Sequence, residues 1–159
     1  MNNCAYREAD NKELKKIVFM GACPGINEGK EQRPFSQYGR AGLSLRVLVS
    51  VLSKMKSDLF TSGRLDDYTL ANAHQKIRRT GTPTLGEIND EGNKARLRKI
   101  LAGDGIVVVA MGKDAAEASR RVEVEPRFLF PHPTSRKVNK PKRGSWQANW
   151  EYWVGEAIK

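Results

Sequence analysis

The chain has 159 residues, enough for one domain with a hydrophobic core and too few for two ordinary domains. Its 28 Lys and Arg against 18 Asp and Glu give a formal net charge of +10, which favours a polyanionic partner such as DNA. Charge alone leaves open a basic protein without such a partner. Cys4 and Cys23 cannot build a four-thiolate iron–sulfur or zinc site, and so few cysteines indicate a reducing cytoplasm.

No apolar run reaches the length of a membrane span, and the polar start of the chain has no signal-peptide core. We therefore expect no membrane partner. No group of His, Cys and acidic residues has the spacing of a metal site, so we also expect no metal and no cofactor.

In chain order, residues 1–15 are polar and are expected to form a loose arm or a short helix. Apolar and amphipathic stretches then alternate between strand and helix patterns. Strands are predicted at 17–20, 68–73, 106–111 and 128–130. Helices are predicted at 42–56, at 90–101, from 113 and from 145. Loops are predicted at 21–40, 74–89 and 134–144.

This alternation predicts a single α/β domain over residues 1–159, a three-layer αβα sandwich around a four-stranded parallel sheet. Ligands of such sheets bind beyond the carboxyl ends of the strands. Those ends carry the segments GACPG, ANAH, AMGKD and FPHPTS. The sequence therefore predicts a functional site where these segments converge.

A phosphate-binding P-loop is not this site. Around the segment GINEGK (25–30), Pro24 stands where the first glycine of that motif belongs, and Glu31 stands where its magnesium-binding Ser or Thr belongs.

Five segments in the same order resemble motifs of the uracil-DNA glycosylase superfamily, over about residues 17–153. GACPGINEGKEQRPF resembles a first motif of the form GEAPG, eight residues, PF, and GRAG at 39–42 matches the start of the next helix. YTLANA, VVVAMGKDA and FPHPTS resemble the second strand, the third strand with its turn, and an HPSP motif. The resemblance implies a protein that takes a base out of the DNA helix and hydrolyses its glycosidic bond, without the iron–sulfur cluster of some members.

The base pocket has its own candidates. Phe35 follows Pro34 in a polar loop and offers a face on which a flipped base stacks, although a core aromatic is the alternative. Asn72 offers a donor and an acceptor for the base edge, although an asparagine at a strand end is often satisfied by backbone. We also expect Gly21, Ala22 and Cys23 to line the base.

His132, between two prolines, is the predicted catalytic residue, because a positioned histidine stabilises negative charge that develops on the departing base. A structural loop histidine is the alternative. His74 is the second candidate at this edge of the sheet.

The first motif differs from that of the family which the chain resembles. Ala22 and Cys23 occupy the two usual places of a water-orienting Asp, Asn or Glu, and Asn27 and Glu28 are the nearest replacements.

The basic segment after His132 is expected to contact DNA. Its candidates are Arg136, Lys137, Val138, Lys140 and Arg143. In the family that the chain resembles, the corresponding loop enters the minor groove and fills the gap left by the flipped base, so Arg136 or Val138 is expected to be the wedge that does so here. The alternative is an ordinary solvated surface loop. Three tryptophans of the last helix are predicted to pack in the core.

These observations predict a monomeric, monofunctional DNA glycosylase. Its target is uracil, a mismatched base or another modified base, with a modified phage base in antiviral defence as one option. The alternative is a non-catalytic DNA-binding module on the same fold. An enzyme acting on free nucleosides is disfavoured by the basic loops beside the pocket.

Overall fold

The computed structural model of the chain describes residues 3–139 and 144–159, and five strands in it form one sheet. The strands are β1 (Tyr6–Arg7), β2 (Ile17–Gly21), β3 (Thr69–Asn72), β4 (Val107–Met111) and β5 (Phe128–Phe130), in the order β1-β3-β2-β4-β5. The four predicted strands are parallel to one another. The fifth, β1, pairs antiparallel with β3, so the sheet is mostly parallel and the prediction of four strands was one too few.

The N-terminal segment is therefore not a loose arm, the first of the two alternatives that we predicted. Cys4 and Ala5 are buried, and the backbone N–H of Asn72 donates to the carbonyl of Ala5 at 3.0 Å. A short 3-10 helix, η1 (Lys12–Leu14), follows. The N-terminal segment is ordered because it pairs with β3, more than sixty residues away in the sequence, so a local sequence pattern does not reveal it.

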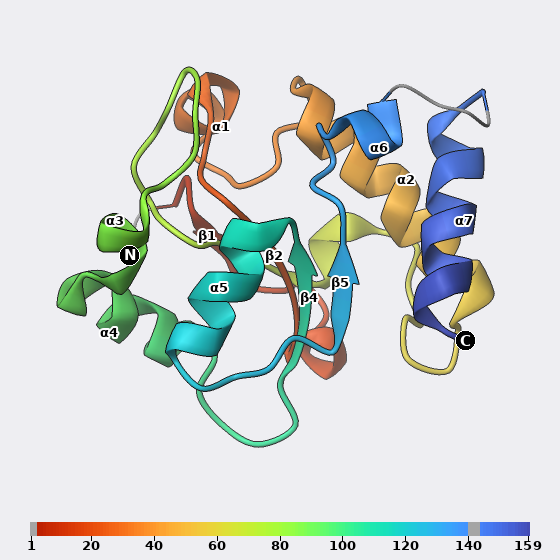
Figure 1. The fold of residues 1–159 in the computed structure, drawn as a ribbon. Helices are drawn as coiled ribbons and strands as arrows, with labels where there is room; N and C mark the ends of the chain where they lie inside the picture. The colour runs from red at the N-terminus through yellow and green to blue at the C-terminus, as the bar shows by residue number, and fades with distance from the viewer. Residues whose placement is uncertain (1–2, 140–143) are drawn as a thin grey trace.

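Helices cover both faces of the sheet (Figure 1). They are α1 (Ile26–Glu31), α2 (Arg40–Met55), α3 (Leu85–Asn89), α4 (Glu91–Ile100), α5 (Lys113–Arg121), α6 (Arg136–Asn139) and α7 (Trp146–Ala157), with a 3-10 helix η2 (Leu65–Asp67) before β3. The short helices α1, α3 and α6 lie in segments predicted as loops. In α3, Thr84 and Glu87 form a capping box that stabilises the first turn.

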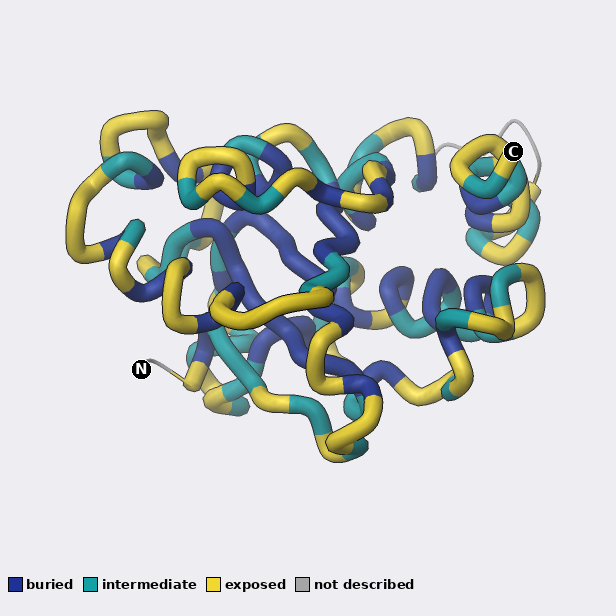
Figure 2. The backbone as a smooth tube through the Cα atoms, turned by 90° about the horizontal axis from the view of Figure 1, so that it is seen from below, coloured by how far each residue is buried: buried dark blue, intermediate teal, exposed yellow. Residues whose placement is uncertain are grey.

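Two hydrophobic clusters hold the layers together, one on each face of the sheet. Helices α2 and α7 pack over Phe19 of β2, whereas α3, α4 and α5 pack over its neighbours Val18 and Met20. Successive side chains of β2 and β3 are all buried, because helices cover both faces of the sheet, whereas the edge strand β5 alternates between buried and exposed residues. Figure 2 shows the buried backbone concentrated in the centre of the molecule. Each fully buried apolar side chain contributes about 1.5–3 kcal/mol. The architecture is α/β and compatible with the predicted three-layer sandwich.

The tryptophans of α7 belong to this core, as predicted. Trp150 is fully buried, and its indole N–H donates to the carbonyl of Ser44 at 3.1 Å, which ties α7 to α2. Trp146 and Trp153 pack against the same cluster and are partly buried. Within the described part of the chain, no helix combines the length and apolar character that a membrane span requires.

Candidate active site

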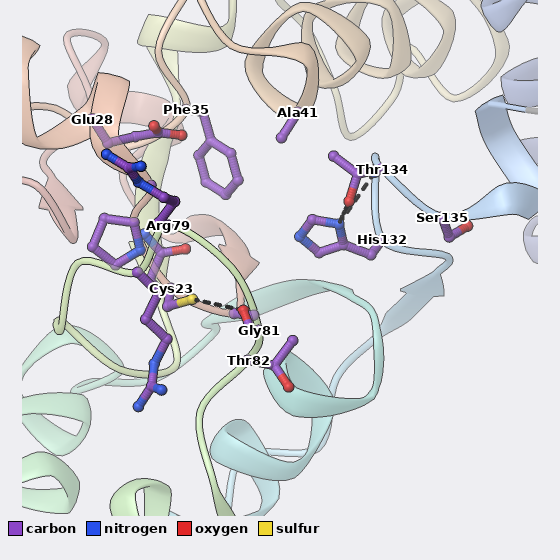
Figure 3. A pocket seen from close by; sticks show the side chains of 15 residues that line it. Cys23, Glu28, Phe35, Ala41, Arg79, Gly81, Thr82, His132, Thr134 and Ser135 are labelled. Carbon is purple, nitrogen blue, oxygen red and sulfur yellow. Dashed lines mark hydrogen bonds between the residues drawn. The ribbon is translucent and has the colours of Figure 1, made fainter.

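A cavity of about 410 Å³ opens at the carboxyl ends of the strands, within the roughly 300–1,000 Å³ of small-molecule sites. Its walls come from the turn after β2, the segment before α2, the end of β3, the loop before α3 and the loop after β5 (Figure 3). The lining residues are Ala22, Cys23, Pro24, Gly25, Glu28, Phe35, Ala41, Asn72, Arg78, Arg79, Gly81, Thr82, His132, Thr134 and Ser135. The structure thus brings together Phe35, Asn72 and His132, which the sequence placed in one site.

Phe35 reaches the cavity through an unusual backbone. Its φ of 54° lies in the left-handed region, which costs a residue with a side chain on the order of 1 kcal/mol. Arg46 of α2 stabilises this conformation, because its Nη1 donates to the Phe35 carbonyl at 3.0 Å. Gly42 lets the start of α2 approach, since a Cβ there would lie 2.0 Å from the Ser36 carbonyl oxygen. Phe35 is 4 % exposed, belongs to the core cluster and also lines the cavity. It is therefore a core aromatic, and its role as a stacking face stays a prediction.

Asn72 is the last residue of β3 and is 2 % exposed. Its backbone is held from two sides: the N–H donates to Ala5, and the carbonyl accepts from Arg96 Nη2 of α4 at 2.8 Å. Its side-chain amide forms no hydrogen bond with the residues that the structure describes. Gly21 was predicted to line the base but is not among the residues that line the cavity. It pairs with Asn72 across β2 and β3, and a Cβ at Gly21 would come 2.9 Å from Asn72 Oδ1 and 2.7 Å from the Phe35 ring. The backbone of Asn72 is therefore fixed in place, and its side-chain amide is available to a ligand.

His132 faces the cavity from the loop after β5, across from Phe35 (Figure 3). The backbone N–H of Thr134 lies 3.2 Å from His132 Nδ1, and the Thr134 hydroxyl lies 2.7 Å from the same atom. A backbone N–H only donates, so Nδ1 is an acceptor and the neutral ring carries its proton on Nε2. Burial lowers the pKa of His132, and the nearby Asp114 carboxylate opposes this in part. His132 is therefore neutral at neutral pH, with a fixed N–H donor.

The turn after β4 leaves room for His132 at the cavity. Gly112 has a φ of 91°, which favours glycine, and a Cβ there would lie 3.3 Å from the Cβ of His132. The segment AMGKD thus contributes a close backbone approach to the site, although its side chains do not line the cavity.

Of the two residues predicted to replace a water-orienting side chain, only one lines the cavity. Glu28 of α1 lines the cavity, and burial raises the pKa of its carboxyl group, partly offset by backbone N–H groups of α1 and Ser36. Asn27 lies outside the cavity lining, with its Nδ2 3.4 Å from the carbonyl of Tyr38. The prediction of Asn27 as a catalytic residue is therefore not supported by its position, because consecutive helical residues point in different directions.

Ala22 and Cys23 line the cavity beside Glu28. Burial raises the pKa of the Cys23 thiol, and Arg78 opposes the shift. The thiol is therefore protonated at neutral pH. Its sulfur lies 4.0 Å from the carbonyl of Gly81, so it packs against the loop before α3.

That loop is the part of the site that we did not predict. Arg78, Arg79, Gly81 and Thr82 all line the cavity. The loop is attached to the turn after β2, because the N–H of Arg78 donates to the Pro24 carbonyl at 3.0 Å. The Arg78 guanidinium also pairs with Glu87 of α3. The two arginines after the ANAH segment were the available signal, but no pattern in the sequence indicates that they turn toward the pocket.

His74 does not line the cavity, so the structure does not support it as a base-binding residue. Its Nδ1 accepts from the backbone N–H of Lys76 at 3.1 Å, a local contact within the loop. Burial lowers the pKa of this histidine, with the Glu87 carboxylate opposing.

The predicted DNA-contacting residues have different surroundings. Arg136 and Lys137 are exposed, and Arg136 follows the cavity-lining Ser135. Val138 is fully buried in the core beside α7, so it is not available as a wedge, and only Arg136 keeps that role. The turn of α6 directs this one apolar residue of the basic segment inward. Lys140 and Arg143 lie outside the described residues.

Among residues 3–139 and 144–159, no three or more His, Cys, Asp or Glu side chains are grouped so as to hold a metal ion. Comparisons of the chain with models of protein families and with curated proteins found no match.

Proposed function

We propose that the protein is a monofunctional DNA glycosylase that flips a uracil, mismatched or otherwise modified base into this cavity and hydrolyses its N-glycosidic bond. The observation that carries the proposal is the Nε2–H of a neutral His132, facing the same cavity as Phe35 and the Asn72 amide. A stacking face, an amide for the base edge and a donor for developing charge are the three groups that base excision requires.

In this proposal the base stacks on Phe35 and is read by Asn72. The amide presents one donor and one acceptor, which complement the O4 and N3–H of uracil. The hydrogen bonds of the Asn72 backbone to Ala5 and Arg96 hold this residue at the cavity before the base arrives, so binding does not have to order its backbone.

His132 then acts on bond cleavage. As the bond between C1′ and the base nitrogen breaks, its electron pair moves to the base and negative charge gathers on the base oxygen. The Nε2–H donates to that oxygen. A neutral donor suits this step, because the hydrogen bond from Nε2–H to the base oxygen strengthens as charge develops there, and no proton has to be transferred.

Water completes the reaction by adding its oxygen to C1′, and Glu28 is the residue that accepts the water proton. Ala22 has no polar group, and the protonated thiol of Cys23 is a poor acceptor. Glu28 lies in the same cavity wall, and its raised pKa brings its proton affinity closer to neutral pH.

The second candidate function is a DNA-binding module that does not cleave. It is favoured by Ala22 and Cys23, which leave the first motif without a carboxylate at the positions nearest the base. The net charge of +10 suits either function.

The deciding experiment is incubation with single- and double-stranded oligonucleotides that carry a panel of modified bases, followed by mass analysis of released bases. Release of one base, with an abasic site left in the strand, supports the glycosylase. Salt-sensitive binding without release of any base supports the binding module. Affinity that is unchanged between low and physiological salt contradicts both.

A further inference from the structure

A second hollow, of about 400 Å³, lies at the β5 edge of the sheet, outside the site described above. Its floor is formed by Leu129 and Pro131, one wall by Ala116 of α5, and the other by Trp153 of α7. We call this hollow the β5 groove. Since β5 is the last strand in the sheet order, this side of it has no strand neighbour in the described chain.

The floor of the β5 groove is unusually apolar for a surface. Leu129 is 52 % exposed, although it is the central residue of a strand whose neighbours Phe128 and Phe130 are 5 % and 4 % exposed. A single exposed leucine is ordinary, but here Pro131, Ala116 and the Trp153 ring continue the apolar surface. A contiguous apolar floor between two helices suits an apolar side chain of a ligand.

The rim of the β5 groove is positive. Lys113 at the start of α5 has no carboxylate partner among the described residues. Lys137 reaches over the Trp153 ring, with its Nζ 5.7 Å from the ring centre. Arg120 also lines the groove but is paired with Glu125, so the unneutralised charge comes from the two lysines. These charges flank the apolar floor and favour carboxylates beside an apolar anchor.

We propose that the β5 groove binds a short acidic segment of a partner protein, with an apolar residue seated on Leu129 and carboxylates on Lys113 and Lys137. Two features favour this occupant over nucleic acid. A phosphodiester backbone gains nothing from the aliphatic floor, and Lys137 lies over the Trp153 ring on which a base would otherwise stack. This site does not depend on the glycosylase proposal.

The test is selection of short random peptides, displayed on a carrier, against the wild-type protein and Leu129→Asp, with Leu85→Asp as the control. Leu85 lies on α3 and is 58 % exposed, so the control makes the same change on an exposed surface. We expect enrichment of peptides that carry acidic residues beside Leu, Phe or Trp on the wild type and on Leu85→Asp, and none on Leu129→Asp.

Fluorescein-labelled copies of the selected peptides then measure the charge contribution by polarisation. Replacing their acidic residues by amides, or Lys113 and Lys137 by Gln, is expected to weaken binding about three- to tenfold, the size of two exposed charge pairs. The proposal is overturned by an absence of enrichment, by neutral or basic winning peptides, or by equal enrichment on Leu129→Asp. It is also overturned if single-stranded oligo-dT binds the wild type and loses its affinity in Leu129→Asp.

Discussion

The two walls of the cavity are built differently. The first, which we call the fixed wall although its residues lie on both sides of the cavity, comprises Phe35, Asn72 and His132. The backbone of Phe35, the backbone of Asn72 and the ring of His132 each accept a hydrogen bond from another residue. The second, the loop wall, is the segment 78–82, largely exposed and attached at Arg78. In the proposed function, this difference means that the groups for cleavage are preorganised, whereas the groups that would meet the rest of the substrate can adjust.

The largest expected effect is on the fixed wall. Replacing His132 by Ala is expected to slow single-turnover base release about 100- to 1,000-fold, the usual cost of one preorganised donor to developing negative charge. The measurement uses enzyme in excess over a substrate oligonucleotide.

His74→Ala is the matched control, because its ring does not line the cavity. It is expected to stay within a few-fold of the wild type. Equal rates for His132→Ala and the wild type would assign the chemistry to another residue.

The next effect tests how the fixed wall is supported. Gly42→Ala places a methyl group 2.0 Å from the Ser36 carbonyl oxygen and 2.6 Å from that of Phe35, so one of these backbones has to move. We expect the free energy of unfolding to fall by more than about 2 kcal/mol, measured by urea denaturation.

Gly39→Ala is its control, since a Cβ there meets nothing closer than 3.7 Å. It is expected to cost less than about 1 kcal/mol. A stability of Gly42→Ala that equals that of the control would show that the approach of α2 to Phe35 is relaxed.

Glu28 lies between the two walls, and its substitution is expected to have an intermediate effect. Glu28→Gln is expected to slow base release roughly tenfold, less than the hundredfold or more of typical general bases, because departure of the base runs ahead of water attack. The neighbouring Asn27→Ala, which lies outside the cavity, is the control.

The raised pKa of Glu28 determines in which direction activity and stability change with pH. The pKa of Glu28 is raised in the folded protein, so activity should rise with pH through a value above the ordinary 4.5, and this limb should be absent in Glu28→Gln. The stability that Glu28 contributes is complete below its unfolded pKa and is lost as pH rises through its folded pKa. Glu28→Gln is therefore expected to gain stability relative to the wild type on going from acid to neutral pH. A constant difference across that range would contradict a buried carboxylate.

On the loop wall we expect smaller effects, seen in affinity. Arg78→Met removes the ion pair with Glu87 and leaves the backbone contact with Pro24 in place. We expect oligonucleotide affinity to fall about two- to fivefold, with little change in the rate at saturation. Arg64→Met, which breaks a similar pair with Asp67 away from the cavity, should leave affinity unchanged. A fall in the saturated rate instead would place Arg78 with the fixed wall.

The smallest effect is expected at Cys23. Its thiol is protonated and packs near Gly81, so Cys23→Ser should keep base release within about threefold of the wild type. A larger loss, measured under the same single-turnover conditions, would give the thiol a part in catalysis.

The residues of the fixed wall were also the part of the candidate site that could be predicted from the sequence. Asn72 and His132 end apolar strands, and in a parallel sheet such ends meet at one edge, so their meeting followed from the order of the strands. The strands β2 to β5 and the helices α2, α4, α5 and α7 have strong apolar patterns and were predicted for the same reason.

What the sequence missed depends on contacts between distant segments or on single turns. β1 has two residues and exists through its pairing with β3. Asn27 and Glu28 are adjacent in the sequence, and only the rotation of α1 decides which faces the cavity. Val138 lies in a basic run, and only α6 shows that it is buried. Residues 78–82 carry no pattern that would indicate the side to which they fold.

The backbone of Asn72 has a consequence for heat resistance. Its N–H bonds to Ala5, beside a two-residue edge strand, and such an edge frays at temperatures at which the central strands stay paired. Fraying would free one side of Asn72, the residue proposed to read the base, while His132, on the opposite half of the sheet, keeps its place. On warming, the proposed activity should therefore become indiscriminate between bases before it is lost.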